Sequence, residues 1–183
     1  MAQAQAKYIF AGGDHERHAD PARNFGGLFR RPVGDGEWEP IMRGLPKNTE
    51  AKAFAVHPTD RNVLYVGTQD GPYRSTDAGS TWERAGLPER DIDIYAITYD
   101  PTRPNVMYAG AAPAAVFRSD DGGETWRRLP NARSPGHCEM DFPVRVIRIA
   151  VDPTRPDDVY VALEVSGVIR SDDGGETFSD LSG

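Results

Sequence analysis

An eight-residue motif occurs three times in this chain, and its spacing constrains the fold more than any other feature of the sequence. The copies follow the pattern S-x-D-x-G-x-T-[W/F] and cover residues 75–82, 119–126 and 171–178. Their starting positions, 75, 119 and 171, are therefore 44 and 52 residues apart. A repeat of this length is typical of supersecondary units that stack, because each unit buries its apolar surface only against its neighbours. The sequence predicts an array of similar units.

A second repeated segment precedes each motif and predicts a tight turn followed by a strand. It starts at His57, Asp100 and Asp152, has proline in its second position, and continues into a β-branched and aromatic run. Proline fixes φ for the turn and cannot pair within a central strand. An alternating apolar stretch before the turn and a short apolar run before the motif predict two more strands, and the motif's aromatic residue opens a fourth. We therefore predict an all-β fold, a β-propeller of four-stranded antiparallel blades.

Four blades can be assigned along the chain, and the first is incomplete. In this degenerate repeat, residues 8–12 align with residues 64–68, and Trp38 lies 44 positions before Trp82, although Val33 replaces the motif aspartate. The predicted bounds within one domain are 8–45 for the partial blade, then 50–88, 93–130 and 144–183. Because the first blade lacks its innermost strand, we expect about three and a half blades, the N-terminal half of a larger propeller with open, self-associating blade faces. The alternative is a complete, compact four-bladed form.

Each residue type in the motif has a structural explanation. Serine and aspartate side chains accept hydrogen bonds from nearby backbone N–H groups, glycine permits positive φ, and the aromatic residue buries a large area between layers. Paired carboxylates such as Asp120–Asp121 could instead bind calcium, but the spacing lacks the distributed ligand set of a calcium loop. We assign a structural role to Ser75, Asp77, Gly79, Thr81, Trp82, Ser119, Asp121, Gly123, Thr125, Trp126, Ser171, Asp173, Gly175, Thr177 and Phe178.

The three motifs resemble the Asp box, or BNR repeat, of bacterial sialidase propellers. Similar boxes occur in sortilin-type propellers, xyloglucan-active glycosidases and photosystem II assembly factors. The resemblance covers residues 8–181 and implies a propeller whose boxes lie on the periphery, remote from the ligand site. For the sialidases it also implies an arginine triad, a Tyr–Glu nucleophile pair and an Asp acid/base, a set that we cannot place in this sequence. Tyr65, Tyr108 and Tyr160 occupy repeat positions that a role in the core strands explains.

Two insertions break the repeat and predict the binding face. Residues 13–26 separate the second and third strands of the first blade, and residues 131–143 precede the innermost strand of the last. Insertions into a repeat form loops on one face, often the binding face. The candidate ligand-binding residues here are His15, His18, His137 and Glu139, and the candidates for catalytic carboxylates are Glu139 and Asp141. The histidines, with Cys138, could bind a transition metal, but a solvated polar loop explains them, so we predict no metal and no cofactor.

Two arginines depart from the repeat on the innermost strand of the last blade. Arg148 replaces a small residue, and Arg145 replaces an acidic one. Guanidinium groups near the channel mouth suit an anionic or carbohydrate ligand, so both are candidate ligand-binding residues. The alternative is a structural ion-pair network with Glu50, Asp93, Glu139 or Asp141. The residues at the corresponding positions are Ala53 and Ala96 for Arg148, and Glu50 and Asp93 for Arg145.

Composition narrows the classes of partner. A formal net charge of −7 and scattered basic residues argue against nucleic-acid binding. Cys138 is the only cysteine, so no disulfide can form within the chain, and residues 1–7 lack the apolar core of a secretory signal. No apolar run approaches the roughly 20 residues that span a membrane. We therefore predict a cytoplasmic protein that contacts neither nucleic acid nor membrane.

These observations predict a binding function more strongly than a catalytic one. We predict a non-catalytic propeller that binds an unknown protein or carbohydrate ligand through loops 13–26 and 131–143. The alternative is a sialidase-like glycoside hydrolase that uses carboxylates near the channel mouth. A metal-dependent enzyme is a third hypothesis, which requires bound metal at His15 or His137.

Overall fold

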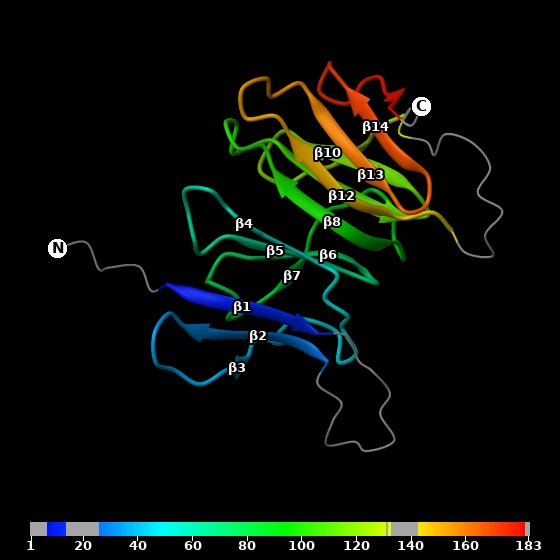
Figure 1. Cartoon of the computed structure of the whole chain (residues 1–183). Helices are drawn as coiled ribbons and strands as arrows, with labels where there is room; N and C mark the ends of the chain where they lie inside the picture. The colour runs from blue at the N-terminus through cyan, green and yellow to red at the C-terminus, as the bar shows by residue number, and fades with distance from the viewer. Residues whose placement is uncertain (1–6, 14–25, 131, 133–142, 182–183) are drawn as a thin grey trace.

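The computed structural model describes residues 7–13, 26–130, 132 and 143–181. All regular structure in these residues is β, and 15 strands form four antiparallel sheets (Figure 1). Three of the sheets have four strands and the first has three. This confirms the predicted all-β architecture of antiparallel blades. No helix among the residues described here is long and apolar enough to cross a membrane.

Each sheet is one blade, and its strands follow one another in the chain from the innermost outward. Blade 1 consists of β1 (Tyr8–Gly13), β2 (Gly27–Pro32) and β3 (Glu39–Pro40). Blade 2 consists of β4 (Ala53–Val56), β5 (Leu64–Thr68), β6 (Gly71–Ser75) and β7 (Glu83–Arg84). Blade 3 consists of β8 (Asp93–Tyr99), β9 (Met107–Ala112), β10 (Ala115–Ser119) and β11 (Arg127–Arg128). Blade 4 consists of β12 (Val146–Val151), β13 (Val159–Leu163), β14 (Gly167–Ser171) and β15 (Ser179–Asp180).

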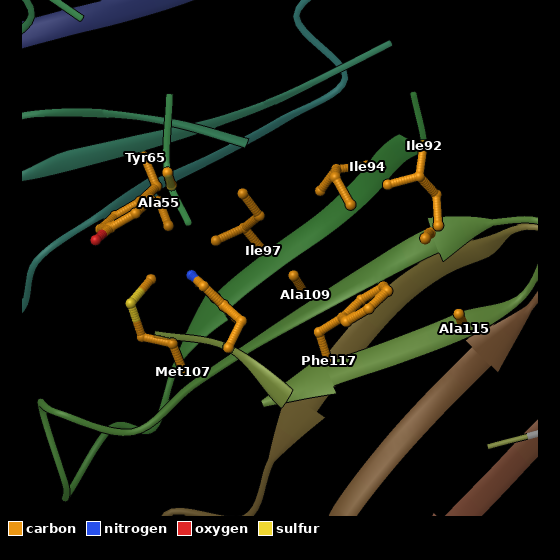
Figure 2. Packing of buried hydrophobic residues seen from close by; sticks show 12 residues of the cluster. Ala55, Tyr65, Ile92, Ile94, Ile97, Met107, Ala109, Ala115 and Phe117 are labelled. Carbon is orange, nitrogen blue, oxygen red and sulfur yellow. The ribbon is translucent and has the colours of Figure 1, made fainter. Parts of the chain in front are cut away.

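The core lies between successive blades, where large side chains of one sheet meet small ones of the next. Figure 2 shows the cluster between blades 2 and 3, in which Ala55 and Tyr65 face Ile97 and Met107. On the other face of β4, Phe54 packs towards blade 1. The predicted assignment of large and small residues to opposite faces is therefore correct for this strand. Full burial of a large apolar side chain contributes roughly 1.5–3 kcal/mol, so these interfaces hold the blades together.

The Asp box forms the same hydrogen-bonded turn in all three copies. In blade 3, Ser119 Oγ bonds to Asp121 Oδ1 at 2.8 Å and accepts the N–H of Gly123 at 2.8 Å. Asp121 also accepts the backbone N–H of Thr125 at 2.9 Å and its hydroxyl at 2.6 Å. Burial raises the pKa of Asp121, but these hydrogen bonds lower it by more, so the pKa lies below its ordinary value. These polar groups of the turn therefore pair with one another and need no ligand.

Each blade also holds the Asp box of the blade that follows it. The hydroxyl of Tyr65 in blade 2 donates to the carbonyl of Gly122 in blade 3 at 2.8 Å. Tyr108 in blade 3 donates in the same way to Gly174 in blade 4 at 3.1 Å. Burial raises the pKa of Tyr65 to about 12, so its hydroxyl remains a donor at neutral pH. Arginines at one repeat position contact the same boxes: Arg30 with Ala78, Arg74 with Glu124, and Arg118 with Gly174.

The register of blade 1 differs by one residue from the sequence prediction. Gly12 pairs with Leu28 as Gly67 pairs with Pro72, so residues 9–13, rather than 8–12, correspond to residues 64–68. The prediction was wrong because it placed Ala11, another small residue, at the position of Gly67. The structure selects Gly12, since a Cβ there would lie 2.7 Å from the Cβ of Ala51. A one-residue shift exchanges the faces of a strand, so Phe10 takes the place of Tyr65.

Candidate ligand-binding groove

A groove runs along the innermost strands of blades 2, 3 and 4. Its volume is about 500 Å³. Strand β8 packs between β4 and β12, so three neighbouring blades contribute to the groove (Figure 1). The residues that line it are 52–56, 95–99 and 147–149.

Two β-bulges place side chains in this groove. The register between β8 and β9 shifts between Ile94 and Ala96, which leaves Tyr95 as an extra residue. Strand β12 has the same irregularity, and there the extra residue is Ile147, which is 49% exposed. A bulge re-aims a side chain and is common beside functional sites. Tyr95 and Ile147 therefore line the groove from equivalent positions of blades 3 and 4.

Polar side chains from three blades surround Tyr95. Lys52 Nζ donates to Asp93 Oδ2 at 2.6 Å and to Tyr95 Oη at 3.2 Å, and it forms an ion pair with Glu50 at 3.3 Å. The Lys52 ammonium lies 4.6 Å from the centroid of the Tyr95 ring, and the Arg145 guanidinium lies 5.0 Å from it. We call Glu50, Lys52, Asp93, Tyr95 and Arg145 the Tyr95 cluster.

The Tyr95 cluster keeps Lys52 charged. Burial lowers the pKa of Lys52, but hydrogen bonds to Asp93 and Tyr95 and the charge of Asp93 raise it by more, so the pKa lies above its ordinary value. A cation against an aromatic face contributes roughly 0.5–2 kcal/mol, depending on exposure. The cluster therefore offers a fixed ammonium, a carboxylate and a phenol beside one another at the groove wall. Such a set can exchange several hydrogen bonds with a ligand that carries hydroxyl groups.

Two of the six residues predicted to bind a ligand lie in the described structure. Arg148 is exposed and lines the groove. Arg145 is half-buried, contacts Tyr95 and forms an ion pair with Glu164 at 3.3 Å, a partner that the sequence hypothesis did not name. The remaining predicted binding and catalytic residues lie outside the described residues: His15, His18, His137, Glu139 and Asp141.

The described ends of both insertions lie beside the Tyr95 cluster. Gly12, near the end of β1, touches Ala51, which directly precedes Lys52. Arg145, two residues beyond the second insertion, contacts Tyr95. In the parts of the chain that the structure describes, no group of three or more His, Cys, Asp or Glu side chains is placed to hold a metal ion.

Sequence reasoning missed Lys52 and Tyr95, although one signal was present. Large apolar residues occupy even positions up to Ile94 and odd positions from Ile97 to Tyr99. This change of parity within one strand indicates one inserted residue, because a regular strand alternates with a period of two. The change marks the bulge at Tyr95. No comparable sequence signal marks Lys52, whose hydrogen-bond partners Asp93 and Tyr95 come from the next blade.

Comparison with known proteins gives a family match and a group of related enzymes. The family model for the BNR/Asp-box repeat matches residues 117–128. Xyloglucanase Xgh74A of Acetivibrio thermocellus is 28% identical over 138 residues, which cover 58% of this chain and 16% of the relative. A xyloglucanase of Hypocrea jecorina is 30% identical over 149 residues, which cover 69% of this chain and 17% of the relative. The chain thus spans about a sixth of the length of these curated relatives.

Among solved structures, an ancestral GH74 enzyme superposes with a TM-score of 0.72 at 23% sequence identity. The superposition covers 99% of this chain and 26% of that enzyme. At this identity the likeness concerns the fold.

Proposed function

We propose that this chain, a β-propeller of BNR/Asp-box repeats, binds a carbohydrate in the groove along β4, β8 and β12 without hydrolysing it. One observation carries the proposal: the Tyr95 cluster and Arg148 place hydrogen-bonding groups along an open groove of about 500 Å³. The relatives named above are xyloglucanases, so a xyloglucan oligosaccharide is the first ligand to test.

The composition of the groove wall suits a polyhydroxylated ligand. Each sugar hydroxyl both donates and accepts a hydrogen bond, so a complementary site needs donors and acceptors. Among the lining residues, Lys52 and Arg148 supply donors, and the Tyr95 phenol can donate or accept. Asp93, which bonds to Lys52 and Tyr95 beside the groove, supplies a further acceptor. Ile147 adds an exposed apolar surface on the same wall. The groove is therefore suited to sugars better than to a purely apolar or purely anionic ligand.

The arrangement of carboxylates supports binding rather than hydrolysis. A glycoside hydrolase needs two carboxyl groups on either side of the scissile bond, one of which donates a proton. Among the described residues of the Tyr95 cluster, the carboxylates are Glu50 and Asp93, and both pair with the same ammonium of Lys52. Both carboxylates are thus already engaged by one cation.

Calorimetric titration of the chain with xyloglucan oligosaccharides tests the proposal. We expect saturable binding, weakened at least about tenfold by Arg148→Ala, because a hydrogen bond to a charged group contributes roughly 1.5–3 kcal/mol. Arg148 is exposed, so the substitution should leave folding intact. Arg128→Ala on the peripheral strand β11 is the matched control and should bind normally. Absence of binding across a panel of neutral oligosaccharides would contradict the proposal.

A sialidase-like or xyloglucanase-like hydrolase is the second candidate, favoured by the names of the relatives. It predicts release of reducing ends from xyloglucan or another glycoside. That release should disappear in Glu139→Gln or Asp141→Asn, with the folded state preserved. Turnover that these variants abolish would replace the binding proposal with the catalytic one. Turnover that persists in both would assign it to other carboxylates.

A further inference from the structure

The inner edge of β1 is exposed. This strand of blade 1 corresponds to the second strand of the other blades. In blades 2 and 3 the corresponding strands, β5 and β9, are buried along almost their whole length. In β1, by contrast, Ile9, Ala11 and Gly12 are exposed, and no strand within the described residues pairs with its inner edge. We call this side of Tyr8–Gly13 the open edge of β1.

Hydrogen-bonding groups of alternate residues point to the open edge. The carbonyl of Lys7 accepts the N–H of Val33 at 2.8 Å, so the odd-numbered residues of β1 bond to β2. Successive residues of a strand direct their backbone groups to opposite sides. Tyr8, Phe10 and Gly12 therefore present N–H and C=O groups to the open edge. In blade 2 the position equivalent to Gly12 is Gly67, whose carbonyl accepts the N–H of Lys52, next to β4.

Two hollows follow the open edge and leave room for another strand. One has a volume of about 350 Å³ and the other about 170 Å³. Phe10 lines both, and its ring stacks on Phe54 of blade 2 with centroids 5.0 Å apart. The space beside the open edge thus has an aromatic floor shared by two blades. The larger hollow is completed by Tyr8, Val56, His57, Pro58 and Arg61.

The open edge has none of the features that protect natural edge strands from pairing. Such edges carry charged residues, proline or a bulge, because unpaired backbone groups otherwise recruit another strand. Tyr8–Gly13 has the sequence YIFAGG, without charge or proline, and its pairing with β2 has no register shift. The open edge is therefore suited to pairing with another strand.

We propose that the open edge of β1 binds an extended peptide segment as a fourth, innermost strand of blade 1. The segment runs antiparallel to β1, as β4 runs antiparallel to β5. Its sequence alternates small and large side chains, because small residues of the inner strands face the next blade. The innermost strands of this chain show the pattern at 53–56 (AFAV) and 148–151 (RIAV), with arginine at one small position.

A peptide that copies residues 50–58, EAKAFAVHP, is the probe for this site. Its control carries an N-methyl group on the amide equivalent to Ala55. The N–H of His57 bonds to Val63, and Ala55 lies two residues from His57 opposite Tyr65, so its amide points to the same edge. We expect the probe to bind the 183-residue chain and the control to bind about tenfold more weakly, since it loses one backbone hydrogen bond and gains a steric clash.

Amide hydrogen exchange followed by NMR locates the bound peptide. Saturating probe should slow exchange at Phe10 and Gly12, whereas Ile9 and Ala11, already bonded to β2, should change little. No binding, or binding without protection of Phe10 and Gly12, overturns the proposal. Protection of these amides in the free chain also overturns it. Sedimentation would then show whether a second copy or the chain's own residues cover the edge.

Discussion

The contacts of Tyr65, Tyr108 and Tyr160 allow one test of how the blades are joined. Replacing each tyrosine with phenylalanine removes one hydroxyl and leaves the ring in place. Tyr65 is the donor that the structure gives to the carbonyl of Gly122, a partly buried group. Loss of that bond should therefore cost about 1–2 kcal/mol of unfolding free energy, because the acceptor is left without its partner.

The same substitution at the other two tyrosines should lower the unfolding free energy by less, and Tyr108→Phe should have a larger effect than Tyr160→Phe. The carbonyl of Gly174 accepts from Tyr108 and also from Arg118 Nη1 at 2.7 Å, so Tyr108→Phe should cost about 0.5 kcal/mol. Tyr160 has no Asp box beyond it within the described residues, so Tyr160→Phe should be close to neutral. The three single variants share the same chemistry and differ in what the hydroxyl reaches, and Tyr160 is also less buried than the other two.

Urea unfolding measures these differences as shifts in the midpoint at constant slope. Tryptophan fluorescence and circular dichroism should give coincident transitions, since the free energies require two-state behaviour. An equal loss at Tyr160 and Tyr65 would refute the argument, because the effect would then belong to the tyrosine side chain in general. A neutral Tyr65→Phe would show that the hydroxyl does not join blades 2 and 3.

Three further predictions follow from single contacts. Gly110→Ala should destabilise the chain by roughly 1–3 kcal/mol in urea, because the new Cβ would lie 2.3 Å from Cγ1 of Val146. His57→Asp should raise the free energy of unfolding by about 0.5–1 kcal/mol, since the His57 ring nitrogen accepts turn N–H groups at 3.0–3.3 Å, whereas the carboxylate of Asp100 accepts them at 2.8–2.9 Å. In acid titration, stability should be constant above about pH 5 and fall as the pH drops below the ordinary aspartate value, because the folded state lowers the pKa of Asp100 and Asp121. Asp121→Asn should reduce this dependence on pH.

Local chemistry made much of the fold predictable from sequence. Ser119, Asp121 and Thr125 bond to one another within seven residues, so their pattern alone determines the turn. The faces of β4 followed from simple alternation. The register of β1 was missed because Ala11 and Gly12 are both small enough to match Gly67 by sequence, and only the contact of Gly12 with Ala51 distinguishes them.

The groove was less predictable, because its parts come from different blades. Arg148 was found since it breaks a repeat position. Lys52 was not, because its role depends on Asp93 and Tyr95, which lie more than 40 positions away and approach only when blades 2 and 3 pack. The bulge at Tyr95 is an insertion of a single residue, and a search for regular alternation along a whole strand does not detect it. Interactions between blades therefore require the structure.

The contact between a tyrosine and the next Asp box gives the chain a direction. A middle blade carries a donor on the face towards its successor and an acceptor turn on the face towards its predecessor, as Tyr108 and Gly122 of blade 3 illustrate. During synthesis, an emerging blade therefore finds its docking partner already synthesised, and assembly can proceed in the order of translation. Duplication of one whole unit within the gene would keep every such contact intact, since the new copy fits both neighbours. Blade number can thus change by copying, without redesign of any interface.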